Sequence, residues 1–168
     1  RCFDDKDVTH VDDRINPVED AETIETELML ADIESIEKRI AGLIRKIRGG
    51  DKEAVEQDRL LKLAMDALEK GHPARSVEIS EDDKVAWKNL QLLTSKPNLF
   101  VCNVDEDSAS DGNKYSQQVE KMASEQGAGT VIISAQIEEE ISQLEEDEAE
   151  LFLNEMGLSE AGLDRLIR

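Results

Sequence analysis

The sequence predicts a fold that is mainly α by residue count, in which an antiparallel coiled-coil helical hairpin is inserted into an incomplete α/β domain. Apolar residues recur at alternating spacings of four and three within residues 29–47 and again within residues 61–68. A Gly-Gly-Asp turn at residues 49–51 separates these two stretches. Two short apolar runs later in the chain flank one helical stretch, which is typical of a single βαβ unit.

The hairpin is predicted from its heptad pattern and from the residues that bound its two arms. The first arm is expected to start after Pro17, with Asp20 as its cap, and to run to Ile47. The second begins after Asp51 and continues to about Lys70, and the short connection forces the two helices to run antiparallel. The seam residues are Met29, Ile33, Ile36, Ile40, Leu43 and Ile47 on the first arm, and Leu61, Ala64, Met65 and Leu68 on the second.

A third helix is predicted to follow Ser80. The Ser80 hydroxyl and Asp83, three residues further on, resemble a capping box. Its apolar side is expected to consist of Ala86, Leu90 and Leu93. Trp87 is interpreted as a packing residue at the base of the hairpin, in preference to a platform for a ligand.

After Pro97 the pattern changes to that of a βαβ unit. Residues 99–104 and 130–134 are nearly continuous apolar runs, which favour strands covered on both faces. Between them, residues 105–114 are loop-like and residues 115–126 are predicted to be helical. Two such strands cannot form a sheet alone, so we expect other chain segments to complete it. Short helices are then expected at about 138–144, at about 146–156 and after a Ser159 cap.

Charge limits the partners that the chain can bind. The sequence has 40 acidic and 20 basic residues, a formal charge of −20, which repels nucleic-acid backbones and makes direct DNA binding unexpected. Most of this excess is interpreted as the solvated outer surface of the coiled coil. One basic cluster, Arg45, Lys46 and Arg48, stands where the first arm ends. It either complements the helix dipole or offers a basic tip to RNA or to a partner protein.

Cysteine and histidine positions give no sign of a metal centre. Cys2 and Cys102 lie far apart in sequence, outside any CxxC arrangement, which indicates neither a disulfide framework nor a zinc site and favours a reducing, cytoplasmic compartment. His10 and His72 are interpreted as surface or loop residues. No apolar stretch approaches the roughly 20 residues that a membrane span needs, so a membrane partner is not expected.

The candidate binding residues follow the two predicted strands. In open parallel sheets, ligands bind beyond the carboxyl ends of the strands. This rule selects residues 103–106, Asn-Val-Asp-Glu, and residues 134–136, Ser-Ala-Gln. An Asn at one strand mouth followed one βαβ unit later by Ser-Ala is the arrangement by which GTPase-type domains hold a base. Taken singly, such residues are turn and cap residues in most proteins.

The order of several motifs resembles the Obg-like ATPase (YchF) family over essentially the whole chain. The central motif is residues 93–97, Leu-Thr-Ser-Lys-Pro, leading into an apolar strand and Asn-Val-x-Glu. The other matching segments are Arg1-Cys2-Phe3, Asn16-Pro17-Val18-Glu19-Asp20, Gly49-Gly50-Asp51-Lys52-Glu53 and Gly162-Leu163-Asp164-Arg165-Leu166-Ile167-Arg168. The resemblance implies an internal piece of a P-loop ATPase of the translation-factor-related GTPase class, with ribosomal or translation components as partners of the coiled coil.

The resemblance also implies adenine as the base. In guanine-specific relatives, the carboxylate of an Asn-Lys-x-Asp motif accepts hydrogen bonds from guanine, whereas adenine offers an acceptor at N1, so a carboxylate there is unfavourable. Here Val104 replaces the Lys, and Glu106 is one methylene longer than the Asp. Asn103 and Val104 are therefore expected to border the adenine, and Glu106 to tether the loop. Ser134, Ala135 and Gln136 are expected to close the other side through backbone groups.

The sequence contains no GxxxxGK[ST] loop, so the groups that hold the ATP phosphates and Mg²⁺ are expected outside it and no catalytic residue is assigned within it. The implied domains are residues 1–16, the end of the first part of the nucleotide-binding domain, 17–94, the coiled-coil domain, and 95–168, the base-recognition part. We do not expect the chain to hydrolyse ATP by itself. The alternative is a free-standing coiled-coil interaction module without nucleotide binding.

Overall fold

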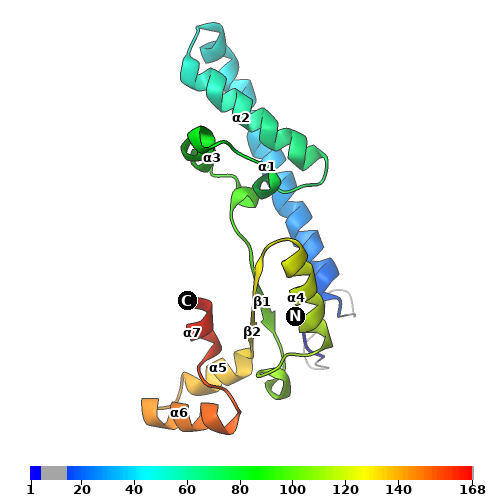
Figure 1. Cartoon of the computed structure of the whole chain (residues 1–168), viewed down its shortest axis with the longest axis vertical. Helices are drawn as coiled ribbons and strands as arrows, with labels where there is room; N and C mark the ends of the chain where they lie inside the picture. Colours follow the sequence, from blue (N-terminus) through cyan, green and yellow to red (C-terminus); the bar gives the residue numbers. More distant parts are fainter. Residues whose placement is uncertain (5–14, 168) are drawn as a thin grey trace. The chain divides into compact units, whose positions relative to one another are not determined.

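The computed structural model describes residues 1–4 and 15–167, so His10, Arg168 and most of the predicted 1–16 segment lie outside the described residues. Two compact units are present (Figure 1). The helical unit comprises Ala21–Pro97, and the α/β unit comprises Arg1–Asp20 together with Asn98–Arg168.

The helical unit is built on the predicted hairpin, and the fold is confirmed as mainly α with a small parallel sheet. Helix α1 spans Pro17–Arg48 and α2 spans Lys52–Glu69. Asp51 caps α2, because its side chain accepts a hydrogen bond from the Ala54 N–H (3.1 Å). Gly50 in the turn has φ of +79°, a conformation that glycine adopts at little cost.

The prediction that Asp20 caps α1 was wrong. The helix starts at Pro17, and Asn16 stands in the capping position. The Asn16 side chain donates to the Glu19 carboxylate (2.8 Å) and accepts from the Glu19 N–H (3.4 Å). Proline is well suited to the first helical position because its missing N–H would have no helical partner there. Asp20 lies within the first turn, where its charge complements the helix dipole.

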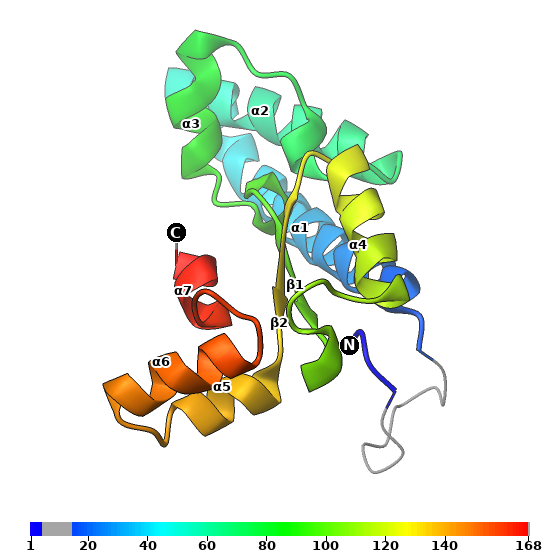
Figure 2. The same ribbon diagram turned by 60° about the horizontal axis from the view of Figure 1, so that its bottom comes forward.

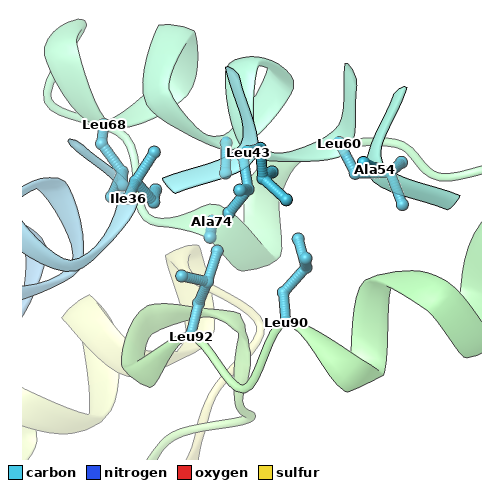
Figure 3. Close-up of a cluster of buried hydrophobic side chains, with 10 residues drawn as sticks. Ile36, Leu43, Ala54, Leu60, Leu68, Ala74, Leu90 and Leu92 are labelled. Carbon is cyan, nitrogen blue, oxygen red and sulfur yellow. The ribbon is translucent and has the colours of Figure 1, made fainter. Parts of the chain in front are cut away.

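The seam of the hairpin forms the larger apolar core (Figure 3). Ile36 of α1 and Leu60 and Leu61 of α2 have no exposed surface. The partly buried seam residues that pack against this cluster include Met29, Ile33, Ile40, Ile47 and Met65. Burial at heptad spacing along both arms accounts for the long α1, since helices in proteins gain most of their stability from such packing.

Helix α3 spans Lys84–Asn89 and follows a 3-10 turn, η2, at Glu81–Asp83. The Ser80 hydroxyl accepts from the Asp83 N–H (3.3 Å) and donates to the Asp83 carboxylate (2.8 Å). Trp87 packs against the hairpin core, as predicted. Leu93 was wrongly placed on the apolar side, because α3 ends at Asn89 and Leu93 lies exposed in the 3-10 turn η3, Leu93–Ser95.

Leu92 takes the buried place that was predicted for Leu93. It is 1% exposed and belongs to the hairpin core, whereas Leu93 is 43% exposed. The helical spacing of the apolar residues is interrupted at Gln91, whose φ is +55°. A helical spacing rule does not extend past such a residue, because the backbone there leaves the right-handed helical region.

A buried carboxylate connects α1 to the segment that leads out of the helical unit. Asp32 is 2% exposed and accepts hydrogen bonds from the Leu93 N–H (2.8 Å), the Thr94 N–H (2.8 Å) and the Thr94 hydroxyl (2.7 Å). The Thr94 hydroxyl in turn accepts from the Ala74 N–H (3.1 Å), in the 3-10 turn η1, Ala74–Ser76. Three charge-assisted hydrogen bonds satisfy the buried carboxylate.

The α/β unit contains the predicted βαβ arrangement (Figure 2). Strand β1, Leu99–Asn103, pairs in parallel with β2, Gly129–Ile133, and α4, Lys114–Glu125, connects them. The Asn113 side chain caps α4 in a reciprocal capping box with Ser116. The core under α4 contains Cys2, Cys102, Val104 and Val119.

Within the described residues, β1 is covered on one face only, whereas its apolar run favoured a strand covered on both faces. Cys102 faces the α4 core and is 2% exposed, whereas Leu99 and Val101 are 48% and 44% exposed. Successive side chains of a strand point to opposite faces, so a run that is apolar throughout does not show how much of each face this chain covers. Helix α7, Gly162–Ile167, lies on the side of the strands opposite α4 (Figures 1 and 2).

The C-terminal helices differ in their starts from the prediction. Helix α5 spans Ala135–Ile141, three residues ahead of the expected start at 138, and α6 spans Glu146–Glu155. Helix α7 begins at Gly162 and not directly after Ser159. Its start is held by the Glu138 carboxylate, which accepts from the Gly162 N–H (2.7 Å) and the Leu163 N–H (3.3 Å). A carboxylate from a distant helix thus replaces the expected local cap.

Candidate functional site

The carboxyl ends of β1 and β2 meet at one edge of the sheet. Asn103 is opposite Ile133 in the parallel register. The Asn103 side-chain oxygen accepts a hydrogen bond from the Ala135 N–H (2.9 Å), and the Val104 N–H donates to the Ile133 carbonyl (2.9 Å). The two stretches selected from the sequence are therefore joined by a side-chain hydrogen bond where the strands end.

The Ser134 hydroxyl is buried at this edge of the sheet. Ser134 precedes α5 as its N-terminal flanking residue and is 3% exposed. Within the described residues, its buried hydroxyl oxygen has no hydrogen-bond partner. A buried hydroxyl without a partner is unfavourable by about 1–3 kcal/mol.

The other candidate residues differ in how exposed their side chains are. The Val104 side chain is 3% exposed and packs in the core under α4, so only its backbone can face a ligand. Ala135 and Gln136 are exposed in the first turn of α5. Glu106 begins the 3-10 turn η4, Glu106–Ser108, and is half-buried. In the described part of the chain, its carboxylate makes no hydrogen bond or ion pair.

The polar groups at this edge suit a flat heterocycle with ring acceptors. Because the Asn103 oxygen is occupied by Ala135, its amide nitrogen remains as a donor. The Ser134 hydroxyl can donate or accept. A purine presents N7 as an acceptor in both adenine and guanine and differs at position 6, an amino donor in adenine and a carbonyl acceptor in guanine. Asn103 can therefore recognise a purine without distinguishing the two bases.

Sequence reasoning missed how Cys2 positions Asn103. The Cys2 N–H donates to the Asn103 carbonyl (2.8 Å), and the Asn113 side chain donates to the Cys2 carbonyl (2.6 Å). The N-terminal segment thus runs beside the end of β1 and fixes its last residue. Its sequence signal was the short Arg-Cys-Phe opening, which has no periodicity from which a pairing partner could be inferred.

The two cysteines are in contact although 100 positions separate them. Both are free, 2% exposed and part of the same core. A hydrogen bond from the Cys102 thiol lowers the pKa of Cys2 to about 7, against the opposing effect of burial. The same interaction, together with burial, raises the pKa of Cys102.

A second candidate surface is the tip of the helical hairpin. Arg45, Lys46 and Arg48 occupy the last turn of α1 and are all exposed. Over residues 1–4 and 15–167, none of the three forms an ion pair, whereas Lys38, Lys62 and Lys70 pair with acids one helical turn away (2.6 Å each). The tip therefore presents three uncompensated cations on a strongly acidic chain.

Neither a metal cluster nor a membrane helix was found among the residues that the structure describes. No group of three or more His, Cys, Asp or Glu residues there is placed to hold a metal ion. No helix in the same residues has the length and apolar character needed to cross a bilayer.

Comparison with known proteins gives consistent matches along the entire chain. The Bacillus subtilis protein named ribosome-binding ATPase YchF is 42% identical, and its namesake from Pasteurella multocida is 40% identical. Each alignment covers 100% of this chain and 46% of the relative, so the chain spans about half the length of these curated relatives. No family model matches the chain.

A solved structure agrees with the fold. The structure of the Schizosaccharomyces pombe YchF GTPase matches with a TM-score of 0.81 and 28% identity, covering 99% of this chain and 46% of that one. The names differ in one respect, because the bacterial relatives are called ATPases and the yeast protein a GTPase. The identity of the base is thus the property that most needs a direct measurement.

Proposed function

Because the chain belongs to the Obg-like ATPase (YchF) family along its whole length, we propose that it supplies the base-recognition part of an ATP-binding, ATP-hydrolysing P-loop protein. The observation that carries the proposal is the meeting of Asn103 and Ser134 at the ends of two paired parallel strands. One side chain keeps a free donor there, and the other has a buried hydroxyl with no partner in the described chain.

In this proposal the α/β unit forms one wall of the purine pocket. The Asn103 amide nitrogen donates to purine N7, and the backbone of Ser134 borders the ring. Backbone groups of Val104, Ala135 and Gln136 line the remainder of the wall. Glu106, at the start of η4, tethers the loop that follows β1.

The phosphates and Mg²⁺ are assigned to residues outside this sequence, because it contains no GxxxxGK[ST] loop. The proposed boundaries follow the sequence prediction, with base recognition in residues 95–168, the end of the preceding nucleotide-binding part in 1–16 and the interaction arm in 17–94. We also propose a cytoplasmic location, in keeping with the ribosome-binding names of the relatives.

A hybrid protein tests the base-recognition proposal. This chain would replace the matching segment of the Bacillus subtilis relative, and ATP affinity would be measured by calorimetry. Asn103→Ala is expected to weaken ATP binding by about tenfold, since a lost hydrogen bond contributes roughly 1 kcal/mol or somewhat more. Asn154→Ala, on the exposed side of α6, serves as the matched control. Unchanged affinity in the Asn103 variant would refute the role assigned to that side chain.

We propose in addition that the hairpin tip contacts the ribosome. The three exposed cations at the end of α1 support this role, because basic groups without acidic partners are available to backbone phosphates. Replacing Arg45, Lys46 and Arg48 by Gln is expected to reduce co-sedimentation of the chain with ribosomes and to flatten its salt dependence.

The control for that experiment changes Lys38, Lys62 and Lys70 to Gln. This triple variant alters the net charge equally, but it removes cations that already pair with acids on their own helices. Equal loss of binding in both variants would show that net charge, and not the tip, governs the interaction.

A further inference from the structure

The α/β unit holds two thiols together at a position where a covalent bond would connect the N-terminal segment to β1. Cys2 and Cys102 are separated by 100 positions, yet both lie in the core under α4 and are hydrogen-bonded to each other. The hydrogen bond from the Cys2 N–H to the Asn103 carbonyl (2.8 Å) brings their backbones alongside one another. Neighbouring strands lie about 4.8 Å apart, and the Cα atoms of a disulfide are roughly 4.4–6.8 Å apart.

We propose that Cys2 and Cys102 form a reversible intramolecular disulfide when the protein meets a peroxide. This modification site is independent of nucleotide or ribosome binding. It depends only on the juxtaposition of the two thiols in the folded α/β unit, which no sequence motif indicates.

The reaction begins at Cys2. Its thiolate, stabilised by the Cys102 thiol, attacks one oxygen of hydrogen peroxide, forms a sulfenic acid and, with a proton, releases one water. The Cys102 sulfur then attacks the Cys2 sulfur, the S–S bond forms, and the departing hydroxyl leaves with the Cys102 proton as a second water. Two thiols are oxidised to one disulfide, and one peroxide is reduced to two waters.

A hollow lies beside the segment that contains Cys2, although neither thiol lines it. It has a volume of about 440 Å³ and is lined by Phe3, Asp4, Asp105, Asn113, Lys114 and Tyr115. Phe3 directly follows Cys2, and Asn113 donates to the Cys2 carbonyl. The thiols are too deeply buried for bulky reagents, so a peroxide is expected to react where a large disulfide reagent does not.

The bond would close a loop that spans most of the chain. A link between residues 2 and 102 restricts the unfolded state strongly, because the stabilisation from a cross-link grows with the length of the closed loop. The oxidised chain is therefore expected to melt at least about 5 °C above the reduced chain. In a reducing compartment such a bond persists only while the oxidant does.

Peptide mapping of the peroxide-treated chain tests the proposal. Mass spectrometry without reductant should find a peptide containing Cys2 joined to one containing Cys102, with the loss of two hydrogen atoms, and dithiothreitol should restore both thiols. The variants Cys2→Ser and Cys102→Ser should each abolish the linked species. Separate sulfinic acids on the two residues, or links between chains in place of the internal link, would overturn the proposal, and the mapping of the unaltered chain gives this answer even if a variant misfolds.

Discussion

Replacing Asp32 by Ala should destabilise the helical unit by about 3 kcal/mol. The substitution removes three hydrogen bonds, to the Leu93 N–H, the Thr94 N–H and the Thr94 hydroxyl, at 2.7–2.8 Å. Leu93 is exposed enough for water to replace its bond, whereas Thr94 is 2% exposed. The estimate therefore counts the two Thr94 bonds at about 1.5 kcal/mol each, the lower end for bonds to a charged group.

Urea unfolding followed by tryptophan fluorescence measures this change. The sequence has a single tryptophan, Trp87, and it packs against the hairpin core, so its signal reports on the helical unit. With a slope of about 2 kcal/mol per molar urea, the midpoint should fall by roughly 1.5 M. Asp32→Asn keeps one acceptor oxygen and should lose about half as much stability.

The exposed acid Glu37, which follows Asp32 by five residues on α1, provides the control. Glu37→Ala should change the free energy of unfolding by less than about 0.5 kcal/mol. If Asp32→Ala costs less than about 1 kcal/mol, or no more than the Glu37 variant, the buried carboxylate does not secure the segment that leads into β1.

Three further predictions follow from individual contacts. Glu138→Ala should speed hydrogen exchange at the first amides of α7 by about tenfold, because it removes both bonds that hold the helix start. Gly112→Ala should lower the melting temperature more than Gly50→Ala, since both have positive φ but only at Gly112 would a Cβ collide with neighbouring side chains. The ultraviolet absorbance of the Cys2 thiolate should reach half its maximal value near pH 7 and fall below that pH as the thiolate is protonated, and Cys102→Ala should move that midpoint upward towards the ordinary value of 9.0.

The sequence was most informative where burial and local spacing agree. Heptad spacing predicted both arms of the hairpin, and Ile36 and Leu61 are fully buried as a seam requires. The two apolar runs predicted parallel strands, and they pair in register from Leu99 to Asn103. In these segments, the side chains that define the pattern also form the core, so periodicity and tertiary packing give the same answer.

Sequence reasoning failed where a distant polar group or a single backbone angle decided the structure. Because Gln91 has a positive φ, Leu92 is buried in the core in place of the predicted Leu93. Asp32 carries no sequence signal that separates it from the other acids of α1, because its partner Thr94 is 62 positions away. Likewise, the apolar pattern of β1 did not predict that its face at Val101 is exposed. An apolar run shows that a strand is suited to burial, but not which segments cover each of its faces.

At the candidate site, the sequence predicted where the two strands end. It did not predict which side chains there are buried and which remain available to a ligand. Asn103 and the segment after β2 do meet, through the bond to the Ala135 N–H. The burial of the Val104 side chain and the unpartnered Ser134 hydroxyl emerge only from the packing around them. The contact between Cys2 and the end of β1 could not be predicted from the sequence either, because the three residues Arg-Cys-Phe are too few to show a periodicity.

Competition between ATP and GTP in the hybrid with the Bacillus subtilis relative would test adenine recognition by this chain most directly. The absence of the guanine-binding Lys and Asp predicts that ATP binds at least about tenfold more tightly than GTP, a difference of roughly 1.4 kcal/mol or more. Equal affinity for the two nucleotides, or tighter binding of GTP, would contradict the assignment of this strand edge as an adenine wall.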